Sequence, residues 1–234
     1  MKENSIPLIK VIIPAFNEED SIGKVIKDIP SEVAEVIVVN NGSTDQTAAV
    51  AETAGATVLY EPQKGYGYAC LCGMDYLIQN HIAPDILVFL DGDYSDHPEE
   101  LPFLLAPIQN NKVDLVVGSR VPHKREKGSM TPQQVFGNGL ACVLMKWLYG
   151  ARFTDLGPFR AIRWEALMAL EMGDKTYGWT IEMQLKVLKM KMKYEEVEVS
   201  YRKRIGVSKV SGTVKGTIFA GIKIVSWIFK HYFS

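Results

Sequence analysis

The stretch Ile86-Leu87-Val88-Phe89-Leu90-Asp91-Gly92-Asp93 decides the fold. Five consecutive apolar residues are typical of a strand that is buried on both faces, and such strands belong to parallel sheets. Two carboxylates follow where the strand ends, with a glycine between them that permits a tight bend. Oxygen ligands at this spacing suit Mg²⁺ or Mn²⁺, so Asp91 and Asp93 are candidate metal ligands; an ordinary Asp-Gly turn is the alternative.

Three further apolar runs lie in the first half of the chain, at residues 11–13, 36–39 and 115–117. Between the runs, helical periodicity predicts helices over residues 21–29, 45–54, 68–80 and 98–109. This alternation predicts a doubly wound α/β fold with a mostly parallel sheet flanked by helices. In such sheets the ligand binds beyond the carboxyl ends of the strands. Four polar clusters occur at those ends: Asn17-Glu18, Asn40-Asn41, Asp91 with Asp93, and Arg120.

The second half of the chain is less regular. Its pattern predicts helices over residues 132–149, 179–191 and 214–233, an edge strand over 197–201 and a loop over 202–209. No linker divides the chain. We therefore expect a single domain spanning residues 1–234, in which a nucleotide half ends near residue 125 and an acceptor half follows.

Composition narrows the possible partners. A formal net charge of −1 and a pI of about 6.4 argue against nucleic acid as a partner. The three cysteines are too few for a disulfide framework, so we expect reduced thiols in a cytoplasmic protein.

The charge is uneven along the chain. Residues 199–234 contain seven Lys or Arg and no acidic residue, which leaves −8 for residues 1–198. The predicted C-terminal helix is amphipathic, and its lysines suit the anionic inner face of a membrane, where the protein would be peripheral. Packing of this helix on its own domain is the alternative.

Several motifs together resemble the family 2 glycosyltransferases of the GT-A fold, and among them the polyprenyl-phosphate (dolichyl-phosphate) sugar synthases. The matching stretches run in order from about residue 8 to residue 212. They are IPAFNE at 13–18, VVNNGSTDQT at 38–47, KGYGYA at 64–69, DGDYS at 91–95, GSR at 118–120, DLGPFR at 155–160 and RIGVSK at 204–209.

The resemblance implies a role for each matching residue. Asp91 and Asp93 would bind the diphosphate of a nucleotide sugar through Mg²⁺ or Mn²⁺, and Arg120 would contact phosphate directly. The nucleotide-binding residues would be Pro14, Phe16, Glu18, Asn41, Lys64 and Asp91. The acceptor phosphate would be bound by Arg160, Arg204 and Lys209.

The sequence departs from the family pattern at two places. Asn40-Asn41 replaces a pair of aspartates, and Ser95 replaces a glutamine that is a metal ligand in the lipid-phosphate synthases. An Asn41 amide suits the N3–H and carbonyl edge of uracil, which favours UDP. The N1–H and O6 groups of guanine also match the Asn41 amide, so GDP remains an alternative to UDP as the donor nucleotide. With Ser95, water would complete the metal coordination.

Two carboxylates of the second half are candidate catalytic residues beside Asp91, Asp93 and Arg120. Asp155 precedes the GPFR motif, and Glu182 lies in the stretch YGWTIE. Each has a structural alternative. Asp155 would be an ion-pair partner, and Glu182 would belong to the start of a buried helix.

The function that we expect is inverting transfer of one sugar from a UDP- or GDP-linked donor to a polyprenyl-phosphate lipid. A phosphate acceptor is already anionic and needs no strong general base, which fits a sequence without an obvious catalytic histidine. A separate membrane protein is a further candidate partner. The rival functions are transfer to a hydroxyl of a glycan or small molecule, where a base is required, and non-catalytic binding of a nucleotide sugar.

Overall fold

The computed structural model describes residues 6–206 and 214–233, and it describes side chains for residues 6–206 and 221–233. Within these residues, one sheet of seven strands has the order β3-β2-β1-β4-β6-β5-β7. The strands are β1 (Ile9–Ala15), β2 (Val33–Asn40), β3 (Thr57–Tyr60), β4 (Ile86–Phe89), β5 (Leu115–Ser119), β6 (Arg160–Arg163) and β7 (Tyr194–Glu198).

The sheet is mostly parallel, as predicted. Strands β3, β2, β1 and β4 pair in parallel, and so do β5 and β7. Strand β6 is inserted between β4 and β5 and runs antiparallel to both. The sequence pattern missed β3 and β6, and β7 begins three residues before the predicted edge strand.

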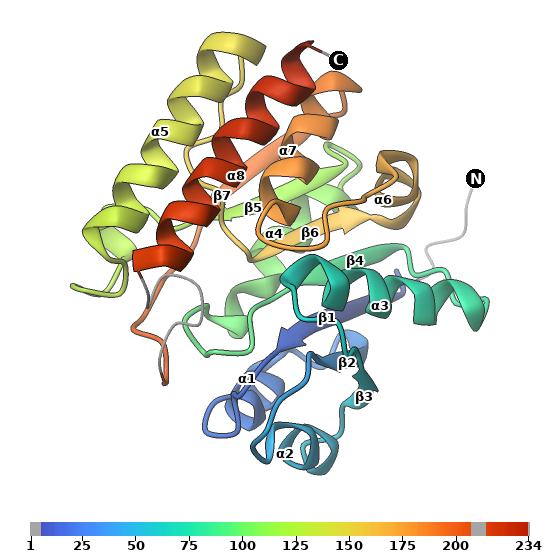
Figure 1. Cartoon of the computed structure of the whole chain (residues 1–234). Helices are drawn as coiled ribbons and strands as arrows, with labels where there is room; N and C mark the ends of the chain where they lie inside the picture. The colour runs from blue at the N-terminus through green and yellow to red at the C-terminus, as the bar shows by residue number, and fades with distance from the viewer. Residues whose placement is uncertain (1–5, 207–213, 234) are drawn as a thin grey trace, which may run out of the picture.

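Helices cover both faces of the sheet (Figure 1). One face carries α1 (Ile22–Asp28), α2 (Thr47–Thr53) and α4 (Leu101–Gln109), the last preceded by the short helix η1 (Pro98–Glu100). The other face carries α3 (Tyr66–Gln79), α5 (Pro132–Tyr149), α6 (Trp164–Leu170), α7 (Trp179–Lys189) and α8 (Val214–Phe233). A second short helix, η2 (Pro122–Lys124), follows β5. Side chains alternate across the strands, so that Ile12 of β1 packs under α3 and Ile13 under α1.

Helix α5 has well-defined ends that its sequence explains. Thr131 and Gln134 form a reciprocal capping box, and Pro132 occupies the first helical turn, where its missing N–H costs nothing. Gly150 ends the helix in the left-handed conformation (φ 67°). These ends match the predicted range of residues 132–149, because local chemistry alone sets them.

Helix α8 packs on the domain, as the alternative interpretation of the tail requires. Ile228 is fully buried, and its carbonyl accepts a hydrogen bond of 2.7 Å from the hydroxyl of Tyr149 in α5. The rings of Tyr149 and Tyr232 are also in edge contact. Another part of the α8 surface remains open, since Ile222 is 61% exposed. Among the described helices, none is long and apolar enough to cross a bilayer.

Candidate active site

A cavity of about 610 Å³ lies beyond the carboxyl ends of β1, β2, β4 and β5. Each of the four predicted polar clusters contributes a wall residue, so their predicted convergence is confirmed. From the first half of the chain these wall residues include Pro14, Phe16, Glu18, Asn41, Lys64, Asp91, Asp93 and Arg120. The second half closes the cavity with residues of α5 and α8, the segment 176–180, Tyr201 and Arg204.

Asp91 and Asp93 present carboxylate oxygens to this cavity. Burial and the neighbouring Asp93 raise the pKa of Asp91 to about 7. The Oδ1 atom of Asp91 is buried without a hydrogen-bond partner among the described residues. Asp93 is oriented by Ser95, whose hydroxyl and N–H both donate to Asp93 Oδ1, at 2.5 and 2.8 Å. An orphaned buried oxygen beside an oriented carboxylate fits a divalent cation, and Asp91 and Asp93 are its candidate protein ligands.

Arg204 lies against these carboxylates. Its guanidinium pairs with Asp93 Oδ2 at 3.1 Å and with Glu18 Oε1 at 3.0 Å. One cationic side chain from the last described loop therefore joins the ends of β1 and β4. Arg204 meets carboxylates here, whereas the sequence analysis predicted a role for it with the acceptor phosphate.

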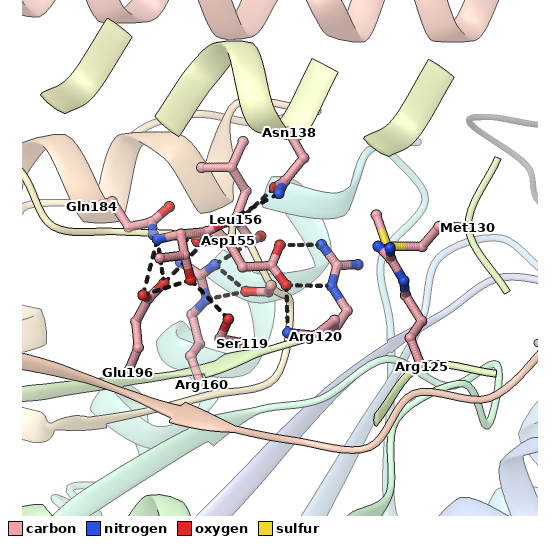
Figure 2. A network of polar contacts seen from close by, with 12 residues as sticks. Ser119, Arg120, Arg125, Met130, Asn138, Asp155, Leu156, Arg160, Gln184 and Glu196 are labelled. Atoms are coloured by element: carbon pink, nitrogen blue, oxygen red, sulfur yellow. Dashed lines mark hydrogen bonds and ion pairs between the residues drawn. The ribbon is translucent and has the colours of Figure 1, made fainter. Parts of the chain in front are cut away.

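Arg120 is held in place by Asp155. Its Nε and Nη2 donate to the two carboxylate oxygens at 2.7 and 2.6 Å, and its backbone N–H adds a third bond of 2.8 Å (Figure 2). The guanidinium also stacks over the ring of Tyr201, 5.0 Å from its centroid. Burial would raise the pKa of Asp155, but the charge and hydrogen bonds of Arg120 outweigh it and keep that pKa below its usual value.

Asp155 does not line the cavity, so the structure supports the ion-pair alternative for it. Asp155 is 3% exposed, and its backbone carbonyl accepts a hydrogen bond of 2.9 Å from the buried side-chain amide of Gln184. Helix α5 supports the same loop through Asn138, whose side-chain oxygen accepts the N–H of Leu156 at 2.8 Å (Figure 2). Asp155 thus positions Arg120 and is itself fixed from two sides.

Arg160 does not reach the cavity, contrary to the prediction that it binds an acceptor phosphate. It is fully buried in β6. Its guanidinium donates to the carbonyl oxygens of Gly157, Thr180 and Leu156 at 3.1, 3.0 and 3.2 Å. Burial lowers its pKa to about 10. Arg160 ties the loop before β6 to α7, and this structural role replaces the predicted one.

Glu182 is also committed to the fold. It is 1% exposed and accepts hydrogen bonds from the backbone N–H groups of Gly173 and Asp174, at 3.0 and 2.7 Å. Lys186, one turn further along α7, pairs with it at 2.9 Å. The buried-helix alternative therefore describes Glu182, which is not among the residues of the cavity wall.

Asn41 lines the cavity, but its amide is used by the protein itself. The amide nitrogen donates to the carbonyls of Glu61 and Gln63 at 3.0 and 2.7 Å, and the amide oxygen accepts the N–H of Gly65 at 2.8 Å. With both donors engaged, Asn41 shapes the 61–65 segment and does not offer a free amide edge to a base.

The glycines of the KGYGYA motif permit a close approach of two backbones. A Cβ at Gly65 would lie 2.2 Å from the carbonyl oxygen of Lys175, and one at Gly67 would lie 2.0 Å from that of Asp174. The N–H of Tyr68 donates to Lys175 at 3.1 Å. The first turn of α3 is thus docked on residues 174–176, while Lys64 reaches over the ring of Phe16, 5.0 Å from its centroid.

The sequence analysis did not single out several cavity residues. Gln133, Gln134, Gly137 and Asn138 of α5 face the cavity, and so does Tyr201. Gln134 and Asn138, polar residues four apart on the predicted helix over residues 132–149, were the available indication. Lys209, predicted to bind the acceptor, lies outside the described residues.

Comparisons with known proteins identify the family of the chain. The family model described as Glycosyl transferase family 2 matches residues 10–170. A protein of Mycobacterium tuberculosis, named an uncharacterized glycosyltransferase, is 34% identical over 91% of this chain and 94% of its own length. The undecaprenyl-phosphate mannosyltransferase of Micrococcus luteus is 29% identical over 94% of this chain and 93% of its own length.

Solved structures of similar shape include glucosyl-3-phosphoglycerate synthase from M. tuberculosis. Its complex with Mn²⁺, UDP and phosphoglyceric acid superimposes with a TM-score of 0.77 and 22% identity, over 97% of this chain and 78% of that one. This likeness confirms the predicted GT-A fold. Because the family model covers more than half of the chain and a relative matches along nearly its whole length, the chain belongs to glycosyl transferase family 2.

Proposed function

We propose that this glycosyltransferase moves a sugar from a nucleotide sugar to the phosphate of a polyprenyl lipid. One observation carries the proposal: among the described residues, no carboxylate of the cavity wall is placed as a base for an acceptor hydroxyl. Glu18 and Asp93 pair with Arg204, and Asp91 belongs to the candidate metal site. Asp155 and Glu182, the other candidates, are buried in structural roles. A phosphate oxygen needs no base, whereas a hydroxyl does.

The donor half of the proposal rests on the carboxyl ends of β1, β2 and β4. Asp91 and Asp93 would hold Mg²⁺ or Mn²⁺, which stabilises the negative charge of the departing diphosphate when bound. Arg120 has two N–H groups fixed by Asp155 and keeps the others for the cavity. A guanidinium already oriented by a buried carboxylate stabilises developing phosphate charge without reorganising during the reaction. UDP is the nucleotide that we favour, since a structural neighbour binds it.

The reaction would be a single displacement. An oxygen of the acceptor phosphate attacks the anomeric carbon from the side opposite the diphosphate, and the bond from that carbon to the diphosphate oxygen breaks as the new one forms. The configuration at the anomeric carbon inverts, and the nucleoside diphosphate leaves. The protein's contribution is to hold both phosphates in line. The name of the Micrococcus relative supports a lipid-phosphate acceptor.

A comparison of matched acceptors tests the proposal. Donors such as UDP-glucose and GDP-mannose are incubated with Mn²⁺ and one of three acceptors: undecaprenyl phosphate, undecaprenol of the same length, or phosphoglyceric acid. We expect product with undecaprenyl phosphate and none with undecaprenol, because only the former is already ionised. Product with undecaprenol, or with phosphoglyceric acid alone, would overturn the proposed acceptor class.

A further inference from the structure

The outward side of α5 carries a continuous apolar stripe. Phe136, Leu140, Val143 and Trp147, here called the α5 stripe, are 73%, 39%, 47% and 81% exposed. Their spacing of four, three and four residues places them on one face of the helix. The opposite face is the one that packs on the domain, through Ala141, Cys142 and Met145. A helix whose two faces are both apolar is expected to have a partner on each.

The two chain segments that contain α5 and α8 have no acidic residue. Residues 127–154 contain three Lys or Arg and no acidic residue, and residues 199–234 contain seven and none. Because the whole chain has a formal net charge of −1, the remaining residues carry −11. Lys146, Arg152 and Lys230 of these two segments are exposed. An apolar surface formed by segments whose charged residues are all cationic is complementary to an anionic lipid surface.

Helix α8 extends this surface. It lies beside α5 in the same direction, since Tyr149 at the end of α5 meets Ile228 and Tyr232 near the end of α8 (Figure 1). Ile222 and Phe229 of α8 are 61% and 40% exposed. The two helices therefore both present apolar side chains that the domain does not cover.

We propose that the α5 stripe, with the exposed apolar residues of α8, docks this protein on an anionic bilayer surface. The cavity is connected to the same helices: Gln133 and Gly137 line it, and each lies one turn before a stripe residue, Phe136 and Leu140. Ile224 of α8 lines it from the other side. Docking thus places the cavity beside the lipid headgroups. The next step rests on the proposed function. In the docked protein, the phosphate of a lipid acceptor reaches Arg120 while the hydrocarbon chain of the lipid stays in the bilayer.

Vesicle sedimentation without donor or acceptor tests the docking. The variants are Phe136→Gln/Trp147→Gln and, as a matched control, Phe103→Gln, since Phe103 is 60% exposed on α4 over the other face of the sheet. We expect the protein to bind vesicles containing one third phosphatidylglycerol and to bind pure phosphatidylcholine more weakly. The double variant should bind the anionic vesicles about tenfold less tightly, and the control unchanged.

Trp147 provides a second measurement that does not depend on a polar substitution. Of the other three tryptophans, Trp164 and Trp179 are 9% and 1% exposed, and Trp227 of α8 is half-buried and packs against the core. Trp147, at 81%, is therefore the indole best placed to meet lipid. Brominated acyl chains should quench its fluorescence in the unaltered protein. Trp147→Phe should retain vesicle binding within about twofold and lose most of the quenching, because the ring stays apolar while the fluorophore is gone.

Several results would overturn the docking surface. Equal vesicle binding by the wild type and the double variant would do so, and so would an equal loss of binding in Phe103→Gln. Quenching in Trp147→Phe as strong as in the unaltered protein would also contradict it. A dimer in light scattering that the double variant dissolves, without any vesicle binding, would assign the surface to a second copy of the chain. A soluble acceptor, farnesyl phosphate, separates the two proposals. The double variant should use it normally. Vesicle binding without any use of farnesyl or undecaprenyl phosphate would reject the proposed function and leave the docking intact.

Discussion

Asp155 binds Arg120 through both carboxylate oxygens, at 2.7 and 2.6 Å, while only the arginine reaches the cavity. Asp155 is therefore a positioning residue for Arg120. Because the pair is almost fully buried, removal of one member leaves an uncompensated charge in the interior. This relationship decides how substitutions at the two positions should behave.

Asp155→Asn should lower the free energy of unfolding by about 3–5 kcal/mol, the range for one broken member of a buried pair. The double variant Arg120→Gln/Asp155→Asn should lose less than the sum of the single variants. Urea unfolding at pH 7 measures all three. A thousandfold loss of kcat with unchanged stability would instead make Asp155 a base, and it would contradict the phosphate acceptor.

The same ion pair predicts a pH dependence of stability. The pKa of Asp155 is lower in the folded protein than in the unfolded chain. Its contribution to the free energy of unfolding is therefore complete at pH values above the unfolded-state pKa, and it is lost as the pH falls through the folded-state pKa. The difference in unfolding free energy between the wild type and Asp155→Asn should therefore be constant above about pH 5 and shrink below about pH 4. A constant difference down to pH 3 would contradict this.

Arg204→Ala should bind Mn²⁺ more tightly in the absence of nucleotide. Its guanidinium now neutralises Asp93, and a partly exposed ion pair is worth about 0.5–1 kcal/mol, so a two- to fivefold lower Kd is expected. Electron paramagnetic resonance of free Mn²⁺ measures it. Lys203→Ala is the control, since it removes the same charge but pairs with Glu126. An equal gain in Mn²⁺ affinity in both variants would mean that the effect comes from the change in net charge and not from the Arg204–Asp93 pair.

Asn41→Asp should destabilise the protein by about 1–3 kcal/mol without changing the preferred base. A carboxylate has no N–H for the carbonyls of Glu61 and Gln63 and would face both of them. Asn40→Asp is the matched control, because Asn40 accepts the N–H of Ser43 and a carboxylate still accepts it. Calorimetry with UDP and GDP, beside thermal unfolding, measures both effects. A switch to GDP with unchanged stability would mean that Asn41 reads the base.

Gly67→Ala should disrupt the start of α3, because its Cβ would lie 2.0 Å from a backbone oxygen. We expect a loss above about 3 kcal/mol or failure to fold. Gly139→Ala, also within a helix, has no atom within 4 Å of the new Cβ and should gain up to about 1 kcal/mol. Similar unfolding temperatures for the two variants would show that α3 can move away from residues 174–176.

The sequence could predict the elements whose pattern is local. Strand β4 is a continuous apolar run, and α5 has its own caps, so both were found. Strand β6 was missed because its sequence, RAIR, begins and ends in arginine. A buried Arg160 becomes acceptable only through carbonyls of the loop before β6 and of Thr180 in α7. Its insertion between β4 and β5 depends on tertiary packing, which no local pattern encodes.

The residues of the candidate site also fall into a group that the sequence could predict and a group that it could not. The positions of Glu18, Asp91 and Arg120 followed from where parallel strands end, which is a property of the fold class. The partners of Asn41, Arg160 and Glu182 could not be predicted, because an amide or a charge looks the same in sequence whether it faces a ligand or a backbone carbonyl.

The place of β6 has a consequence for biosynthesis. A ribosome makes the chain from its N-terminus, so β5 leaves the exit tunnel before either of its neighbours, β6 and β7, exists. Until residue 163 has emerged, β4 is an open edge with unpaired N–H and C=O groups, which invite pairing with other chains. A nascent chain that stalls between residues 119 and 160 should therefore depend on chaperones more than one that stalls after residue 198.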